Sequence, residues 1–240
     1  MMLGRNLDWE GCFNARDLGG LPTVEGRRTR WSAVVRSDSL DHLTVAGWSA
    51  LEAHGIRTIV DLRNEEELEY EAQARPDAIT TVHVPLDDIA DTDFWKYLWD
   101  EELDGTPLVH RPFLERKPER CAAAVAAVAR AQPGGVVVHC GIGRDRTGIV
   151  ALLLLALVGV SPEEIASDYE LSNERLRPHW VGLGWEDQSA WAEERLKREG
   201  TSARDLILAT LASLGDLDAY FRMGGLDDED LAALRTRLLE

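Results

Sequence analysis

Residues 136–148 read VVVHCGIGRDRTG, and this stretch limits the folds open to the chain more than any other. Its β-branched run is typical of a buried strand, and two glycines lead from it into an apolar segment that favours a helix from Thr147. The five residues between Cys140 and Arg146 can therefore curl so that their backbone N–H groups converge, an arrangement that binds anions. The positive end of the helix dipole would face the same point. We interpret the stretch as a phosphate-binding loop.

Cys140 carries the chemistry that this loop predicts. A cysteine beside a guanidinium at the start of a helix is favoured as the thiolate, which is a good nucleophile for phosphorus. Arg146 can hold two phosphoryl oxygens bidentately in the transition state, and Thr147 could hydrogen-bond the sulfur. The alternative is a buried cysteine that acts as a small hydrophobe at a tight turn. The combined pattern of strand, His-Cys, five residues, Arg-Thr-Gly and helix is far more specific than a lone glycine pair.

The pattern H-C-x5-R-T-G resembles the signature loop of the protein tyrosine phosphatase superfamily. The form HCxxG[K/R]DRTG is similar to its bacterial branch, which includes the mycobacterial phosphatase B, and Arg144 stands where that branch usually has Lys. The resemblance implies a phosphocysteine intermediate, with Cys140 as nucleophile and Arg146 on the phosphoryl group, and no metal or organic cofactor. The residues expected to bind substrate are Gly141, Ile142, Gly143, Arg144, Thr147, Gly148 and Asp61.

Two further stretches resemble the same branch. N14-A-R-D-L-G-G20 matches its N-terminal motif, with Ala15 in place of Phe, and Y169-E-L-S-N matches a D-Y-x-x-S-N element. By spacing alone the first is only a turn. The resemblance covers most of the chain.

Strand and helix patterns alternate along the chain, which predicts an α/β class with a central, mostly parallel sheet flanked by helices and a helical C-terminal part. We expect one phosphatase-like catalytic domain over residues 1–240. The expected strands are 33–37, 56–62, 80–85 and the run before Cys140. The expected helices are 40–55, 64–74, 119–131, the run from Thr147, one from Ser161 and one over 220–239. The Gly- and Trp-rich tract 178–191 predicts no structure.

The chain has 26 basic and 43 acidic residues, a formal charge of −17. Such a charge repels nucleic acid and anionic membranes, so neither nucleic acid nor a stable membrane association is expected. The apolar run 149–160 is too short to cross a bilayer and is interpreted as a buried helix. Without a secretory signal pattern, we expect a cytoplasmic protein. The three cysteines lack metal-type spacing, so no metal site is expected. The oligomeric state stays open.

Three aspartates compete for the role of proton donor. Asp145 lies inside the loop, where repulsion by a bound phosphate would raise its pKa unless it is salt-bridged or turned outward. Asp88 follows the third strand, at a position that resembles the general-acid loop of dual-specificity phosphatases. Asp61 could reach the crevice or anchor an arginine. We rank them in that order. His139 points away from Cys140 on the strand and is expected to order the loop rather than act as its base.

Other functions remain open at this point. The loop could bind phosphoryl groups without turnover, or belong to a rhodanese-type sulfurtransferase, which a thiosulfate assay would reveal. For the phosphatase, the resemblance implies phosphotyrosine and also phosphoserine, phosphothreonine or phosphoinositide substrates, on a protein or a small ester. Arg144 could meet a second phosphate of such a ligand or pair with Asp145 or Asp61.

Overall fold

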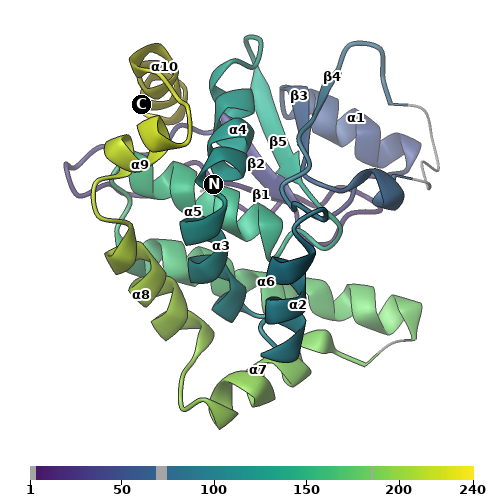
Figure 1. The fold of residues 1–240 in the computed structure, drawn as a ribbon. Helices are drawn as coiled ribbons and strands as arrows, with labels where there is room; N and C mark the ends of the chain where they lie inside the picture. Colours follow the sequence, from purple (N-terminus) through teal and green to yellow (C-terminus); the bar gives the residue numbers. More distant parts are fainter. Residues whose placement is uncertain (1–3, 69–74, 185) are drawn as a thin grey trace.

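A computed structural model describes residues 4–68, 75–184 and 186–240, and its centre is a five-stranded sheet (Figure 1). The strands lie in the order β1-β2-β5-β3-β4. β1 runs antiparallel to β2, and the other neighbouring pairs are parallel. The expected α/β class with a mostly parallel sheet is confirmed. The bounds are β1 Arg16–Asp17, β2 Val34–Ser37, β3 Ile56–Asp61, β4 Thr80–His83 and β5 Gly135–His139.

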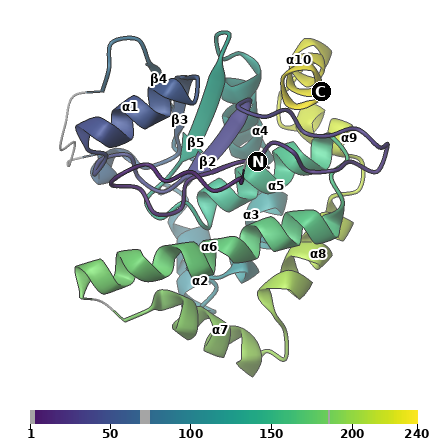
Figure 2. The same ribbon diagram turned by 180° about the vertical axis from the view of Figure 1, so that it is seen from behind.

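Helices cover both faces of the sheet and form most of the C-terminal part (Figures 1 and 2). The α-helices of the described residues are α1 Val45–Ala53, α2 Thr92–Asp100, α3 His110–Arg116, α4 Pro118–Ala129, α5 Arg146–Leu157, α6 Pro162–Leu183, α7 Gln188–Arg198, α8 Ala203–Leu214, α9 Leu217–Met223 and α10 Asp228–Leu238. Two 3-10 turns, η1 Glu65–Glu67 and η2 Pro107–Val109, lie in the connections.

Alternating side chains of the central strands pack on opposite faces, as the period of a strand requires. Val136 and Val138 of β5 belong to a large core that includes α4 and α5, whereas Val137 lies in a smaller core with α1 and the N-terminal segment. β5 is buried along its whole length. The catalytic-loop candidate therefore starts from the most enclosed strand of the sheet.

The apolar run after Thr147 forms α5, whose residues from Thr147 to Leu155 are buried on all sides. The expected buried central helix is confirmed. No described helix has the length and apolar character needed to cross a membrane.

Two of the expected helices have different bounds in the structure. The helix expected over 40–55 starts only at Val45, because the hydroxyl of Thr44 caps it by accepting from the amide of Gly47 at 3.2 Å. The helix expected over 220–239 is split into α9 and α10, with a turn at Gly224 and Gly225 between them.

The tract without predicted structure is also more regular than expected. α6 continues through Pro178 and ends at Gly184, which adopts the left-handed conformation with φ 66°. α7 then begins at Gln188. Of the helix expected over 64–74, the structure has only η1, and residues 69–74 lie outside the described part.

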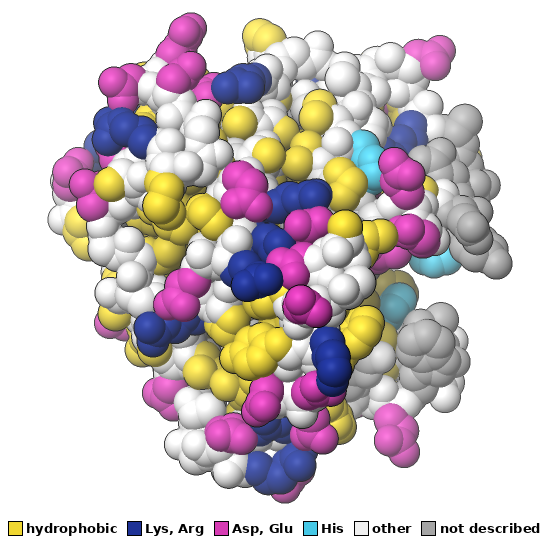
Figure 3. Space-filling view, viewed as in Figure 1, with side chains coloured by type: hydrophobic (Ala, Val, Ile, Leu, Met, Phe, Trp, Pro, Cys, Tyr) yellow, Lys and Arg dark blue, Asp and Glu magenta, His cyan; other side chains and the backbone are white. Residues whose placement is uncertain are grey.

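Acidic and basic side chains are interspersed on the face shown in Figure 3, with apolar side chains gathered between them. The acidic residues that follow β4 also have basic neighbours, because Asp88 and Asp91 pair with Lys117 at 2.9 and 2.6 Å. The net charge of −17 is therefore not gathered into one field here.

Candidate active site

The strands β2, β3 and β5 end in register at one edge of the sheet. Ser37, Asp61 and His139 are paired across the three strands, so the residues that follow them emerge side by side. Cys140 is the first residue beyond β5 and is 2% exposed. In a parallel sheet this carboxyl edge is where ligands bind.

The loop can approach β2 only because of Gly143. This residue has φ 68°, and a Cβ on it would lie 2.3 Å from the carbonyl oxygen of Ser37. Any other side chain would force the backbone apart at this point. Glycine is therefore required at position 143 both by the positive φ and by the short distance to the backbone of Ser37.

The carbonyl groups of the loop are held from behind. The side-chain amide of Asn14 donates to the carbonyls of Ile142 and Gly143 at 3.0 and 3.2 Å, and Arg36 donates to that of Gly143 at 2.7 Å. The amide of Ser39 donates to the carbonyl of Gly141 at 2.7 Å. These contacts fix the carbonyls on the side away from the loop centre.

The backbone N–H groups of residues 141–145 behave differently from the carbonyls. Within the described chain, none of them has a hydrogen-bond acceptor. Five successive donors without acceptors, next to the N-terminus of α5, form a concavity with the character of an anion site. Burying such donors is costly unless a ligand accepts from them.

The two outlying motifs meet beneath this loop. Arg16 donates to the side-chain oxygen of Asn14 at 2.6 Å and to the carboxylate of Asp168 at 3.1 Å. Arg36 donates to the other oxygen of Asp168 at 2.8 Å. Burial alone would raise the pKa of Asp168, but these guanidinium groups hold it well below its usual value. Figure 2 shows the N-terminal segment running beside α6, as these contacts require.

Arg146 begins α5, and its guanidinium faces two carboxylates. Its two Nη atoms lie 2.6 and 2.7 Å from the carboxylate oxygens of Glu67, and Nη1 lies 3.1 Å from Asp87. Glu67 is positioned by η1, where it also accepts from the amide of Asn64 at 2.8 Å. The Nε–H and one Nη2–H remain as a planar fork for a phosphoryl group.

Glu67 and Asp87 were not among the site residues predicted from sequence. The acidic run after Asn64 gives no indication that one of its carboxylates pairs with Arg146, as Glu67 does. The only available signal was the N-cap at Asn64 followed three residues later by Glu, which is a capping-box spacing.

Asp61 and His139 brace the loop from the side. Asp61 accepts two hydrogen bonds from Arg63, at 3.0 and 2.9 Å, and lies 3.4 Å from Nε2 of His139. Burial would raise the pKa of Asp61, but Arg63 and His139 more than offset this effect and hold it well below the usual value. His139 Nδ1 donates to the carbonyl of Cys140 at 3.2 Å, and burial lowers its pKa to about 4.

Asp145 is salt-bridged rather than directed at the loop centre. It lies 3.3 Å from Nε of Arg144 and accepts from the hydroxyl of Tyr169 at 3.2 Å. Burial would raise the pKa of Asp145, but Arg144 and this hydrogen bond lower it. Arg144 pairs with Asp145, one of the partners expected for it, and is only 3% exposed.

The aspartates of the surrounding loops differ sharply from one another. Asp88 is held by Lys117 and Arg120 at 2.9 and 3.1 Å, and its pKa is lowered, first by the hydrogen bond from Lys117. Loss of solvation raises the pKa of Asp87, although Arg146 opposes it. Loss of solvation and the charge of Asp145 raise the pKa of Asp104.

The remaining predicted residues surround the same loop. Thr147 is fully buried, and its hydroxyl has no partner within the described residues. Gly148 packs closely on Tyr169, where a Cβ would lie 3.0 Å from the ring. Gly141 and Ile142 line a groove of about 430 Å³. Phe13 and His179 lie on the same groove with their ring centroids 5.3 Å apart.

Among residues 4–68, 75–184 and 186–240, no three His, Cys, Asp or Glu side chains are clustered so that they could hold a metal ion. The side chains that meet at the loop are thus a thiol, guanidinium groups and carboxylates. They suit anion binding and nucleophilic attack.

Comparison with known proteins places this geometry in a family. A family model described as the tyrosine phosphatase family matches residues 7–240. A candidate tyrosine-protein phosphatase of Cupriavidus necator is 32% identical over 71% of this chain, and the match spans 64% of that relative, slightly under two thirds of its length. A tyrosine-protein phosphatase of Nostoc commune is 29% identical, over 86% of this chain and 74% of that protein.

Two further matches are more distant or shorter. The triple specificity protein phosphatase PtpB of Mycobacterium tuberculosis is 30% identical over 69% of this chain and 68% of that protein. A crystal structure of a TpbA variant of P. aeruginosa in complex with pTyr matches at 16% identity, over 74% of this chain and 85% of that chain, with a TM-score of 0.32 that is too low to add to the argument. The family match covers the loop, both outlying motifs and α10, and the chain belongs to the tyrosine phosphatase family.

Proposed function

We propose that the chain hydrolyses phosphate monoesters through a phosphocysteine on Cys140. The observation that carries this is the set of five loop amides without acceptors, which surround the first residue beyond β5. A tetrahedral phosphoryl group would satisfy these donors, and the N-terminus of α5 would stabilise its charge. Family membership supports the same activity.

The proposed reaction has two displacements at phosphorus. In the first, the Cys140 sulfur forms a bond to phosphorus while the bond to the ester oxygen breaks and that oxygen takes a proton. In the second, water attacks the phosphocysteine, releases inorganic phosphate and returns the thiolate. The fork of Arg146 that Glu67 and Asp87 leave open would hold two phosphoryl oxygens throughout. The hydroxyl of Thr147 is the candidate donor to the sulfur.

For the proton donor we propose Asp104, in place of the order inferred from sequence. A donor must hold a proton before transfer, and Asp104 has a raised pKa without an ion pair to any described residue. Its neighbour Gly105 is tied to the catalytic loop, because Arg144 donates to the Gly105 carbonyl at 2.8 Å. Asp145 and Asp88, the first two sequence-based candidates, both have lowered pKa values and cationic partners.

Replacement of each aspartate by asparagine tests the assignment. Asp104→Asn should slow an alkyl phosphate by about 10²–10³-fold and an aryl phosphate with an acidic leaving group by less than about threefold, because only the first needs the proton. Asp88→Asn is the matched control and should affect both alike. If Asp145→Asn or Asp87→Asn discriminates between the leaving groups and Asp104→Asn does not, the assignment to Asp104 is wrong.

We further propose aryl phosphates, with phosphotyrosine as the natural class, as the preferred substrates. The groove beside Gly141 and Ile142 presents the rings of Phe13 and His179, which suit contact with a phenyl ring. The relative named for triple specificity supports testing phosphoserine, phosphothreonine and phosphoinositides as well. A profile of phosphate release across these classes decides the preference. Equal rates for aryl and alkyl esters in wild type and in Phe13→Ala would contradict it.

A further inference from the structure

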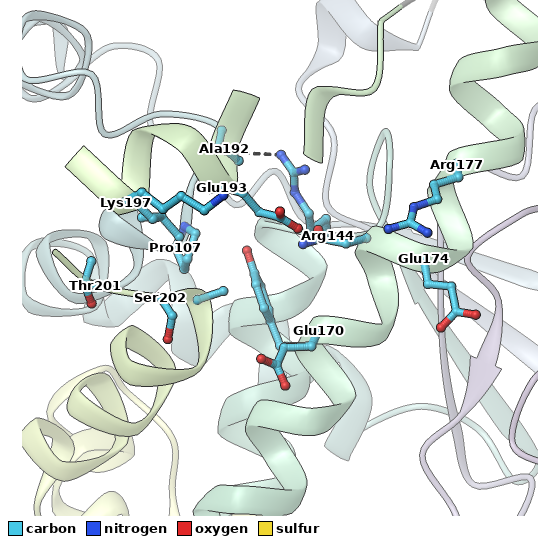
Figure 4. A pocket seen from close by; sticks show the side chains of 15 residues that line it. Pro107, Arg144, Glu170, Glu174, Arg177, Ala192, Glu193, Lys197, Thr201 and Ser202 are labelled. Atoms are coloured by element: carbon cyan, nitrogen blue, oxygen red, sulfur yellow. Dashed lines mark hydrogen bonds between the residues drawn. The ribbon is translucent and has the colours of Figure 1, made fainter. Parts of the chain in front are cut away.

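A second cavity, of about 400 Å³, lies between α6 and α7 and reaches Arg144 (Figure 4). It shares no lining residue with the groove beside Gly141 and Ile142. Its volume falls within the range of small-molecule sites. The cavity is therefore separate from the proposed substrate groove, although the same loop borders both.

Arg144 contributes a buried donor with no acceptor. Its Nη2 donates to the carbonyl of Gly105 and its Nε faces Asp145, but its buried Nη1 has no partner within the described chain. The residue is 3% exposed. A buried guanidinium N–H left unpaired costs free energy that a ligand acceptor would remove.

The charged side chains around the cavity are mixed in sign, but they are oriented differently. In Figure 4, Arg177 and Lys197 point toward the space that Arg144 faces, while Glu170 and Glu174 point away from it. Glu170 is already paired with an arginine of α8 at 2.6 Å. Arg177 lies 3.8 Å from Asp187, so the unpaired donor of Arg144, together with Lys197, is what favours an anion here.

The rest of the wall combines apolar side chains with the polar Asn173, Thr201 and Ser202. Pro107, Ala192 and Leu196 line it, together with Ala203 at the start of α8. We propose that this cavity binds a small organic monoanion with a short alkyl body, its carboxylate on Nη1 of Arg144 and its chain against Leu196. The ligand is distinct from the phosphate ester at Cys140, so the site does not depend on turnover.

Calorimetric titration of the full chain with n-alkanoates from butanoate to decanoate tests this site, with orthovanadate present so that the catalytic loop is occupied. At least one member should bind with one-to-one stoichiometry, and the alkylammonium ion of the same length should not. Ala203→Leu, which fills the cavity, and Lys197→Glu, which reverses one inward charge, should each weaken binding at least about tenfold. These variants leave the proposed catalytic residues unchanged.

Arg198→Glu is the matched control. Arg198 is the next residue on α7, is 55% exposed and pairs with Glu102 outside the cavity. Its reversal should change alkanoate affinity by less than about twofold, as expected for a surface charge. Absence of binding by every alkanoate would overturn the proposal. So would equal binding by the alkylammonium ion, loss of binding with vanadate, or equal effects of Lys197→Glu and Arg198→Glu.

Discussion

The catalytic loop and the acidic residues that face it are built in different ways. The loop is fixed by buried and partly buried contacts from distant parts of the chain, with Asn14 and Arg36 holding its carbonyls and Asp168 holding both motifs together. Glu67, which pairs with Arg146, and Asp104, the proposed proton donor, come from connections between secondary-structure elements.

This difference separates two tasks. An anion site in this family needs donors that do not rearrange when charge develops, and buried hydrogen bonds supply that rigidity. A proton donor must reach a leaving group whose size varies, and a surface connection permits such adjustment. We therefore expect changes on the loop side to affect all substrates alike and changes on the acidic side to depend on the leaving group.

The largest expected effect comes from the proposed nucleophile. Cys140→Ser should abolish turnover, because a serine hydroxyl at this place lacks a base to ionise it, while tungstate binding survives on the backbone amides. Phosphate release and calorimetric titration measure the two properties. Activity within about tenfold of wild type would remove Cys140 from the mechanism.

A smaller loss of activity is expected when Arg146 is replaced by a residue that keeps the positive charge but lacks the planar guanidinium. Arg146→Lys should slow all substrates by about 10²–10³-fold, since an ammonium cannot make the planar bidentate contact. Arg130→Lys is the matched control, because Arg130 makes a bidentate pair with Asp230 away from the loop, at 2.8 and 2.6 Å. Similar losses in both variants would point to stability and not to the transition state.

Removing a side chain that holds the loop carbonyls in place should slow catalysis less than removing a group that binds the phosphoryl oxygens. Asn14→Ala removes the hydrogen bonds to the carbonyls of Ile142 and Gly143 and should lower kcat/KM by about 10–100-fold for every substrate, through a displaced loop. Asn6→Ala, at an exposed asparagine of the same segment, is the control. If the loss of kcat/KM in Asn14→Ala depended on the leaving group, the proposed difference between the loop and the acidic residues would be wrong.

The last prediction concerns the pH dependence of stability and not activity. Burial lowers the pKa of His110 and of His139 to about 4, so their contribution is complete above pH ~6.5 and is lost as the pH falls from there toward 4. Each should reduce the free energy of unfolding by about 3 kcal/mol over this window. His110→Phe should remove about half of that slope in urea titrations, because neither ring nitrogen has a partner within the described residues. An unchanged slope would exclude His110 as a cause.

The loop could be predicted from the sequence because its signals lie close together along the chain. The run from Val136 to Gly148 contains its own strand, turn and helix signals, and β5, the loop and α5 follow them closely. The motifs at Asn14 and Tyr169 were recognised by resemblance, but the contact between Asn14 and the loop spans more than a hundred residues and has no local signal. Only the tertiary structure shows that Arg16 and Asp168 bind each other.

The acidic side was predicted less well for a physical reason. A surface run of Asp and Glu has the same appearance whether one carboxylate turns inward or all are solvated. Asp88 was a candidate proton donor and its neighbour Asp87 was not, yet Asp87 lies 3.1 Å from Arg146 while Asp88 is paired with Lys117. Asp104 carries no sequence signal, because its raised pKa arises from lost solvation and from Asp145.

Trapping of the covalent intermediate tests the central claim most directly. We would mix the full chain with an aryl phosphate, quench in acid within milliseconds, digest the protein and locate phosphate by mass spectrometry. The account predicts phosphate on the sulfur of Cys140, at close to one per chain when hydrolysis of the intermediate is slower than its formation, and none in Cys140→Ser. Turnover with phosphate on another residue, or labelling that persists in Cys140→Ser, would contradict it.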